Sequence, residues 1–412
     1  MNMKFKSLEI SDWKQFHNLN IQFHDKLTVL TGANGSGKTT ILNMLARHFG
    51  WSLNELATPA KDEESGIIRF FSRWFKKKIN SNSSLIGKIY YSNNTVANIQ
   101  IPDSNKAQYQ PQINPAYAIR GLNIPSHRPV FYYQQIPNIS TKKRTKETAY
   151  QLTFQNHMSK YHIGHSQPSK PTNFFIKETL LNWAIGGSGN EFMQADKELY
   201  DYYKGFESVL TAILPKTLGF NKISIRNYEI VLETESGDFM LDAVSGGVSA
   251  IIDLAWQIFN YVKDENEAVT VLIDEVENHL HANMQRSILP DLISAFPNLQ
   301  FIISTHSPLI IGSVKDSNVY AFRYNEERKI YNEQLDLINK AKSATEILNE
   351  VLGVPFTMPI WVENSLNEIT EKYSNQELTK DSFQQMRIEL KELGLDNLMP
   401  LALEKSIEKN NG

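Results

Sequence analysis

A glycine-rich loop between an apolar strand and a helix constrains the fold of this chain more than any other feature. Residues 32–40 read GANGSGKTT; they follow the apolar run LTVL and precede the helix-like run ILNMLARHF. The loop satisfies the spacing G-x-x-x-x-G-K-[ST], with the strand and the helix on the sides where that pattern requires them. A glycine turn that happens to precede a helix is the alternative, but all the fixed positions and both flanks agree. The sequence therefore predicts an α/β fold built around a phosphate-binding loop.

The residue types of this loop suit a nucleotide with its magnesium ion. Glycines let successive N–H groups point inward, and the helix after the loop adds its positive N-terminus. Lys38 would reach the β- and γ-phosphates, and the hydroxyl of Thr39 would bind Mg²⁺. We expect nucleotide contacts from every residue of the loop, namely Gly32, Ala33, Asn34, Gly35, Ser36, Gly37, Lys38, Thr39 and Thr40.

A second anion-binding turn is predicted in LDAVSGGVSAIIDLAWQIF. Ser245, Gly246 and Gly247 stand at the start of a helix whose apolar residues recur at helical spacing. A serine hydroxyl, bare glycine amides and a helix N-terminus would suit phosphate oxygens. An ordinary helix cap explains the same three residues, so the motif gains weight only from the acidic strand end a short way downstream.

Two carboxylates follow the apolar strand of VTVLIDEVENHLH. Asp274 and Glu275 emerge at the carboxyl end of this strand, the edge at which α/β sheets bind their ligands. Asp274 would hold the magnesium ion, and Glu275 would polarise the water that attacks the γ-phosphate. The alternative is an acidic strand end on the surface.

A further apolar strand, in LQFIISTHSPLII, delivers Ser304, Thr305 and His306 to the same edge. There the imidazole would contact the γ-phosphate or the attacking water. A lone histidine after a strand is more often structural. Its order after the Asp-Glu pair favours the catalytic interpretation, with Glu275 and His306 as the catalytic residues.

Composition narrows the class of protein. The chain has 412 residues, 41% hydrophobic and 21% charged, which is ordinary for a globular protein of two or three domains. A net charge of -3 and a pI near 6.4 argue against a general coat that binds polyanions. The absence of cysteine excludes disulfides and thiolate zinc sites. No signal-like or membrane-spanning run is visible, so we expect a cytoplasmic protein with no membrane partner.

The pattern along the chain predicts an antiparallel entry of two short strands in KSLEISDWKQFHNLNIQF, then β-ribbon up to about residue 120. One or two strands interrupted by Pro125 and Pro129 come next, then helices from 141 to 215 with a glycine-rich turn, AIGGSGNEF, between them. Amphipathic helices end the chain. Five segments result: 1–50 with the loop, 51–135 as β-rich insertion and return strand, 136–240 as helical insertion and hairpin, 241–325 as the second half of the site, and 326–412 as a helical region.

GANGSGKTT, VSGG, VLIDEVENHLH and STHSP, in this order, resemble the phosphate loop, signature, magnesium strand and switch histidine of ABC-type ATPases. The similar subgroup is the soluble one of SMC, RecF and OLD-like ATPases, within the wider AAA family. The resemblance covers roughly a quarter of the chain. It implies an α/β ABC-type P-loop head with an antiparallel β subdomain, a helical insertion and a small helical C-terminal region.

The resemblance also implies roles and partners. ATP and Mg²⁺ would be the cofactors, ATP hydrolysis the reaction, and Thr39 with Asp274 the metal ligands. In such ATPases two heads dimerise head to tail, so Ser245 and Gly247 would cap the γ-phosphate bound by another copy, in a dimer or higher oligomer. Val248 departs from the Gln or Glu that generally follows the signature. The glutamine loop has two candidate positions: Gln134 with Gln135, or the run Ser126, His127 and Arg128.

The sequence has no long heptad pattern, no base-reading N-K-x-D motif and no C-terminal acidic nuclease cluster. These features argue against an SMC protein, a GTPase and an OLD-type nuclease, and they favour a stand-alone ATPase. This pattern resembles ATPases of bacterial antiphage defence, such as those of Septu, PARIS and retron operons. The resemblance implies a sensor or regulator of a separate nuclease or toxin. The alternatives are a DNA-repair ATPase that binds DNA directly and a scaffold that holds ATP.

Basic runs at residues 69–80 and 140–148 leave a nucleic-acid partner open, although an amphipathic helix explains the first equally well.

Overall fold

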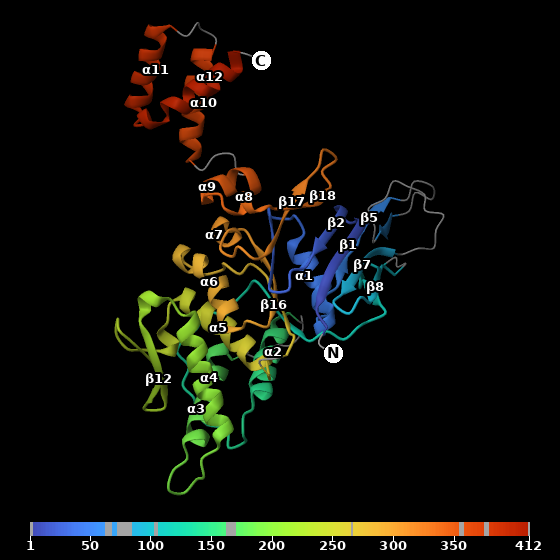
Figure 1. The fold of residues 1–412 in the computed structure, drawn as a ribbon, viewed down its shortest axis with the longest axis vertical. Helices are drawn as coiled ribbons and strands as arrows, with labels where there is room; N and C mark the ends of the chain where they lie inside the picture. The colour runs from blue at the N-terminus through green and yellow to red at the C-terminus, as the bar shows by residue number, and fades with distance from the viewer. Residues whose placement is uncertain are drawn as a thin grey trace. The chain divides into compact units, whose positions relative to one another are not determined.

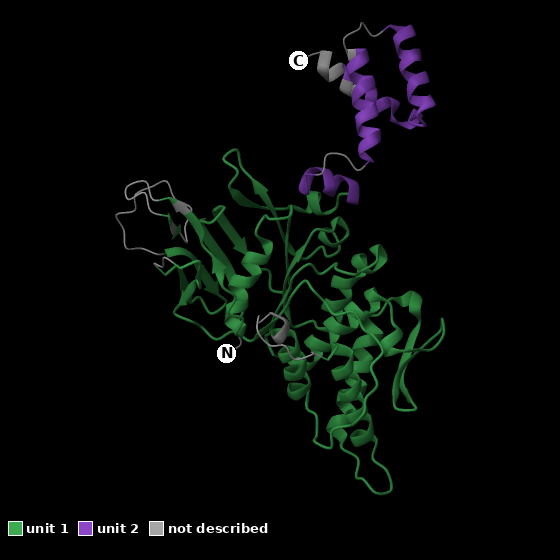
Figure 2. Cartoon of the chain, turned by 180° about the vertical axis from the view of Figure 1, so that it is seen from behind, with its two compact units in different colours: residues 1–342 green, residues 343–412 purple. Residues whose placement is uncertain are grey.

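The computed structural model describes residues 3–61, 68–71, 85–102, 106–161, 170–264, 267–353, 358–374 and 379–410. Two compact units divide the chain, one of residues 1–342 and one of residues 343–412 (Figure 2). The first unit holds the phosphate loop, the signature turn, the acidic strand end and the switch histidine. None of the described helices combines the length and the apolar character that crossing a bilayer requires.

An 11-stranded mixed sheet is the framework of the first unit. In Figure 1 its N-terminal strands are blue and cyan, and its later strands, such as β17 and β18, are orange. Five neighbouring strands are parallel, and in order across the sheet they are β17 (Asn318–Tyr324), β3 (Leu27–Gly32), β16 (Gln300–Thr305), β15 (Thr270–Ile273) and β11 (Gly121–Ile124). Beyond β17 the sheet continues, mainly antiparallel, with β18 (Ile330–Gln334), β2 (Phe16–Gln22), β1 (Phe5–Trp13), β7 (Leu85–Tyr91), β8 (Val96–Gln100) and β10 (Gln112–Asn114).

The central parallel strands are buried along their whole length. Every residue of β3, β15 and β16 is buried, the pattern of strands that are covered on both faces. Strand β2 instead alternates buried and exposed residues, as a strand with one solvated face does. The loop, the acidic pair and the histidine therefore leave the sheet at one edge, where β3, β15 and β16 end.

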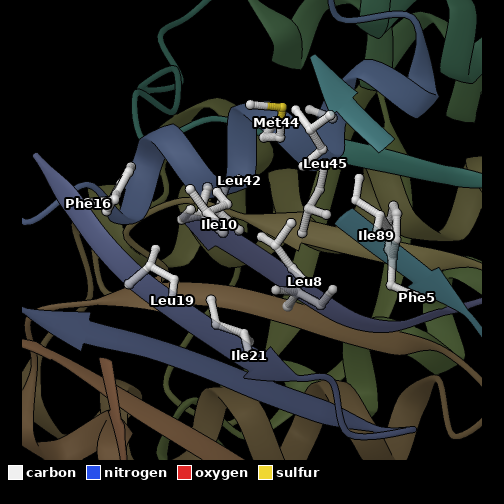
Figure 3. Packing of buried hydrophobic residues seen from close by; sticks show 14 of the residues in the cluster. Phe5, Leu8, Ile10, Phe16, Leu19, Ile21, Leu42, Met44, Leu45 and Ile89 are labelled. Atoms are coloured by element: carbon white, nitrogen blue, oxygen red, sulfur yellow. The ribbon is translucent and has the colours of Figure 1, made fainter. Parts of the chain in front are cut away.

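Helix α1 (Lys38–Ala46) packs against the parallel strands β3, β15 and β16 and shares a buried cluster with the antiparallel strand β1. Figure 3 shows Leu42 and Leu45 of this helix meeting Leu8 and Ile10 of β1. These side chains are at most 1% exposed. The phosphate loop is thus anchored on both sides, by a buried strand before it and by an apolar helix face after it.

The helices of the first unit follow the sequence pattern only in part. They are α2 (Lys146–Tyr161), α3 (Thr172–Ser188), α4 (Lys197–Ile213), α5 (Gly246–Tyr261), α6 (Ala282–Ala295), α7 (Pro308–Ile311) and α8 (Leu337–Lys340). The prediction of a glycine-rich turn at AIGGSGNEF was wrong for its first half, because Gly186 and Gly187 lie inside α3. A Cβ at Gly187 would lie 2.6 Å from the backbone nitrogen of Tyr200 on α4. These glycines let two helices approach, and Figure 1 shows α3 beside α4.

The predicted strand region around Pro125 and Pro129 contains one strand, β11. Residues 125–144 form neither strand nor helix, because proline lacks the N–H that a central strand needs. Shorter ribbons complete the unit: β12 (Phe220–Arg226), β13 (Glu229–Thr234) and β14 (Phe239–Met240) in one sheet, β4 (Glu55–Leu56) with β9 (Gln108–Tyr109), and β5 (Thr58–Lys61) with β6 (Ile68–Phe71).

The C-terminal unit is helical and has its own small core. Its helices are α9 (Ala344–Glu346), α10 (Ile360–Ser374), α11 (Lys380–Glu392) and α12 (Met399–Asn410). Leu366, Met386 and Leu390 are fully buried within it. The sequence placed the start of this region at residue 326. The structure assigns β18 to the main sheet instead, and the boundary between the units follows Lys342.

Candidate functional site

The phosphate loop has the backbone conformation that its glycines permit. Gly32, Gly35 and Gly37 have φ values of 138°, 77° and 87°, which side chains of L-residues rarely tolerate. A Cβ at Gly37 would also lie 2.3 Å from the ring of Phe16 on β2. The loop therefore requires glycine here both for its conformation and for the space beside it.

Lys38 lies across the mouth of this loop and is 5% exposed. Its Nζ donates to the carbonyl oxygens of Gly32 and Ala33, each at 3.0 Å. Burial lowers the pKa of Lys38 to about 8, although three nearby carboxylates act in the opposite direction. The ammonium group thus stands over the loop, where phosphate oxygens would be its natural partners.

Thr39, Asp274 and Ser304 form one hydrogen-bonded group. The hydroxyl of Thr39 lies 3.2 and 3.0 Å from Oδ1 and Oδ2 of Asp274. Ser304 donates its hydroxyl to Oδ1 of the same carboxylate at 2.5 Å. Register explains the meeting, since Ile273 of β15 pairs with Ile303 of β16 and the next residue of each chain segment is then adjacent. Three chain segments therefore converge on the carboxylate of Asp274.

Glu275 follows in an unusual backbone conformation, with φ of 46°. Its N–H donates to Oγ of Ser304 at 2.8 Å, and its Oε2 accepts from Nδ2 of Asn278 at 2.7 Å. Nε2 of His306 lies 4.0 Å from Oε1 of Glu275. The two predicted catalytic side chains therefore face each other at the edge of the sheet, both about one-third exposed.

The backbone of His306 is fixed by a third carboxylate. Its N–H donates to Oε1 of Glu277 at 2.5 Å, whereas Oε2 of Glu277 is buried with no hydrogen-bond partner among the described residues. Burial, and then the positive charge of Lys38, lower the pKa of His306. The imidazole is consequently neutral at pH 7 and retains one nitrogen that can accept a proton.

Arg128 settles which of the two candidate glutamine-loop positions reaches the site. Its guanidinium donates to backbone carbonyls of the segment 274–278 that carries Glu275. Gln134 makes its backbone contacts elsewhere, donating to Asp242 and accepting from Lys177. The run that contains Ser126, His127 and Arg128 is thus the one that the structure brings to the acidic strand end.

The signature turn stands at the start of a helix, as predicted, and Ser245 caps that helix in the way the alternative interpretation expects. Ser245 is the N-cap of α5 and accepts from the N–H of Val248 at 3.4 Å. Gly246 has open space around its Cβ position, whereas a Cβ at Gly247 would lie 3.0 Å from the carbonyl oxygen of His279. Among the described residues, no hydrogen bond joins this turn to residues 32–40. Its role as a phosphate cap stays a prediction.

The two basic runs differ in what the structure describes. Most of the first, residues 69–80, lies outside the described residues. In the second, Lys143 pairs with Asp196 and Glu198 at 2.6 Å each, and Arg144 pairs with Glu178 at 2.6 Å. These two cations are already neutralised by carboxylates of the same chain, which weakens the case for phosphate binding there.

The residues at the strand edge fit a magnesium ion. Thr39 and Asp274 offer hydroxyl and carboxylate oxygens, the donors that Mg²⁺ prefers. Among the described residues no three His, Asp, Glu or Cys side chains converge as a complete metal cage. This fits a metal that takes the rest of its ligands from phosphate oxygens and water.

Several residues of this site could not be found from the sequence motifs. The motif places Ser304 at the same sheet edge as His306, but its contact with Asp274 was not predicted. Nothing in the spacing of Glu277 or Asn278 marks either of them as a partner of His306 or Glu275. Arg128 was one of several open candidates. The signal that could have found them is their position beside the strand ends, because polar residues there share one edge of the sheet.

Known proteins are similar to this chain in sequence and in structure. Septu protein PtuA of Bacillus thuringiensis is 21% identical over 375 residues, which is 87% of this chain and 86% of that protein. The retron Ec83 probable ATPase of Escherichia coli is 28% identical over 154 residues, 37% of this chain and 28% of that protein. The solved SMC head domain from Thermotoga maritima covers 82% of this chain and 100% of its own, with a TM-score of 0.41 and 14% identity.

A family model described as AAA ATPase domain matches residues 3–311, from the first strand past the switch histidine. The match contains the phosphate loop, the signature turn and both strands that end in site residues. It also includes the insertions between them. Because it spans most of the chain, this chain belongs to the AAA ATPase domain family.

Proposed function

We propose that the chain binds ATP with Mg²⁺ and hydrolyses it to ADP and phosphate. The observation that carries the proposal is the convergence of Thr39, Asp274 and Ser304 beside Glu275 and His306. Loop, carboxylates and histidine come from three strands far apart in sequence, yet they share one sheet edge. The membership in an ATPase domain family supports the same reaction.

The mechanism assigns one task to each group. Residues 32–40 would hold the phosphates through backbone N–H groups, with Lys38 on the β- and γ-phosphates. Thr39 and Asp274 would hold Mg²⁺, which supplies charge neutralisation on the phosphate oxygens when bound. Glu275 would accept the proton of the attacking water, because its carboxylate stands free of the metal-binding pair and partly open to solvent.

His306 would orient the attacking water or the γ-phosphate. Its lowered pKa leaves the ring neutral at pH 7, so one nitrogen donates and the other accepts. The hydrogen bond from its N–H to Glu277 fixes the start of the segment after β16. The ring would therefore approach the reacting group with little loss of conformational freedom.

We further propose a head-to-tail dimer, or a higher oligomer with the same contact, in which Ser245, Gly246 and Gly247 cap the nucleotide of a second copy. The N-terminus of α5, a helix of 16 residues, gives this turn the partial positive charge that suits a γ-phosphate. A site shared between two copies would convert nucleotide state into self-association.

The cellular role that we propose is control of a separate effector, such as a nuclease or toxin, in antiphage defence in the cytoplasm. Support comes from relatives named Septu protein PtuA and retron Ec83 probable ATPase. The helical C-terminal unit is a candidate contact for that effector, since it has its own core. Direct DNA binding is the weaker alternative, because the described cations Lys143 and Arg144 are paired.

Steady-state phosphate release tests the enzymatic proposal. The wild-type chain should release phosphate from ATP only with Mg²⁺ present, and Glu275→Gln should lower the rate about 100-fold or more, because a general base contributes that much. Glu327→Gln, at an exposed position, is the matched control and should leave the rate unchanged. Equal rates in all three chains would contradict the assignment of Glu275.

A further inference from the structure

Arg128 is a buried cation without a carboxylate hydrogen bond among those described. Its side chain is 5% exposed, and it lies four residues after β11 in a segment with no regular structure. Nη2 donates to the carbonyl oxygens of Asp274 at 3.1 Å and Glu275 at 3.0 Å. Nη1 donates to those of Val276 and Asn278 at 3.4 and 3.3 Å. One guanidinium therefore gathers four carbonyls of a single turn.

This turn is the one that aims Glu275. The residue has φ of 46°, a conformation that costs a non-glycine residue about 1–2 kcal/mol and persists only where the surroundings hold it. Two contacts of the chain already fix its N–H and its side chain, through Ser304 and Asn278. The carbonyl oxygen of Glu275 also accepts from the N–H of Asn278 at 3.1 Å, but four carbonyls still converge on one side of the turn, and converging carbonyl dipoles repel one another. A buried guanidinium between them removes that repulsion and fixes their directions.

A buried carboxylate of α5 also acts on the charge of Arg128. Asp253, which is 0% exposed on α5, is the strongest of the carboxylate influences on the guanidinium. It lies two helical turns after Ser245, the N-cap of the same helix. Asp253 itself accepts from Gln257 at 2.8 Å, so its direction is set within the helix.

We propose that Arg128 is a positioning residue for Glu275: its guanidinium holds the turn 274–278 in the shape that hydrolysis requires. The proposal rests on the proposed function, since it assumes that Glu275 is the general base. It adds a residue that takes no part in binding nucleotide.

The test uses the full chain with two substitutions at Arg128. Arg128→Met removes the charge and all four hydrogen bonds, whereas Arg128→Lys keeps the charge but not the planar fork. Arg144→Met is the matched control, since it removes another largely buried arginine, one that pairs with Glu178 away from the site. For each chain we would measure kcat, the Kd of a fluorescent ATP analogue, the melting temperature, and hydrogen exchange of the amides in residues 274–278.

We expect Arg128→Met to lower kcat about 100-fold, the size of effect that misplacing a catalytic group produces, with Kd changed by less than about threefold. Arg128→Lys should recover part of kcat. Exchange in residues 274–278 should rise in both variants and not in Arg144→Met. Combined with Glu275→Gln, Arg128→Met should lower kcat no further, because both act on one step.

Three results would overturn the proposal. The first is a kcat that falls only as far as in Arg144→Met. The second is a Kd that worsens as much as kcat. The third is unchanged exchange in residues 274–278. If Arg128→Met does not fold, Arg128→Lys decides by the same readouts. Should the wild-type chain lack ATPase activity, the proposed function fails, while hydrogen exchange still shows whether Arg128 holds the turn.

Discussion

The hydroxyl of Thr39 lies 3.0 Å from Oδ2 of Asp274, although 235 residues separate them in sequence. Thr39 lies in the first turn of α1, at the end of the phosphate loop, and Asp274 follows a strand two places across the sheet from β3. Everything inserted between them, from β-ribbons to the α2–α5 helices, leaves this contact intact. The contact is where the two halves of the site meet.

Gly37 of the phosphate loop can be compared with Gly50, which lies outside the loop and has nearly the same φ. The comparison separates the cost of a positive φ from the cost of a steric clash at Cβ. Gly37 has φ of 87° and Gly50 has φ of 84°, but only a Cβ at Gly37 would meet a neighbour, the ring of Phe16 at 2.3 Å. Gly50→Ala should cost about 1–2 kcal/mol from the backbone alone. Gly37→Ala should cost more and weaken ATP binding, measured by urea unfolding and by titration with a fluorescent analogue. Equal effects of the two substitutions would show that Phe16 does not define the loop.

Binding of ATP should take up protons near pH 8. Burial lowers the pKa of Lys38 to about 8, so roughly half of nucleotide-free chains carry a neutral amine at that pH. Bound phosphates favour the charged form and raise this pKa again. Calorimetry in buffers of different ionisation enthalpy should show uptake that rises from near zero at about pH 6.5 to about half a proton at about pH 8. Uptake that does not change over this range would contradict the lowered pKa.

The sequence could predict those parts of the site that a local pattern marks, but not those that depend on contacts between distant segments. Strand β3, the loop and α1 were predictable, because an apolar run, fixed glycines and a helical pattern occur together. The contact of Ser304 with Asp274 was not, because it depends on the register of β15 against β16. The position of Gly187 inside a helix was not predictable either, because glycine is needed there to make room for the backbone of Tyr200 in another helix. Local sequence patterns predict local structure. They do not predict which residues meet across the sheet or between helices.

The helical part of the first unit should depend on one buried ion pair. Lys177 is 1% exposed and donates to Asp242 at 2.5 Å and to Glu229 at 2.6 Å. Lys177→Met leaves the carboxylate of Asp242 buried without its partner, which should cost about 3–5 kcal/mol.

The matched control for this pair is Lys222→Met, which removes a half-exposed lysine paired with Glu233 at 3.3 Å. It should cost about 1 kcal/mol or less. Urea unfolding followed by tryptophan fluorescence measures both variants. Indistinguishable midpoints for the two would show that the buried pair contributes little to stability.

Two inactive variants should restore activity to each other if the site is shared between copies. Lys38→Ala disables the phosphate loop, and Ser245→Arg fills the signature turn. In a head-to-tail dimer the mixed species has one intact site, so an equal mixture should recover about a quarter of wild-type turnover. Each variant alone should stay inactive. A mixture as inactive as its components, although the chains associate, would contradict a signature that acts in trans.

A single-turnover measurement tests the central claim most directly. Wild-type chain and Glu275→Gln are each mixed in excess with radiolabelled ATP and Mg²⁺, and the bound nucleotide is analysed over time. We predict equal binding, conversion to ADP by the wild type, and retention of intact ATP by Glu275→Gln, with a rate constant lower by about 100-fold or more. Equal conversion by both chains, or no binding by either, would contradict a site in which loop, magnesium ligands and Glu275 act together.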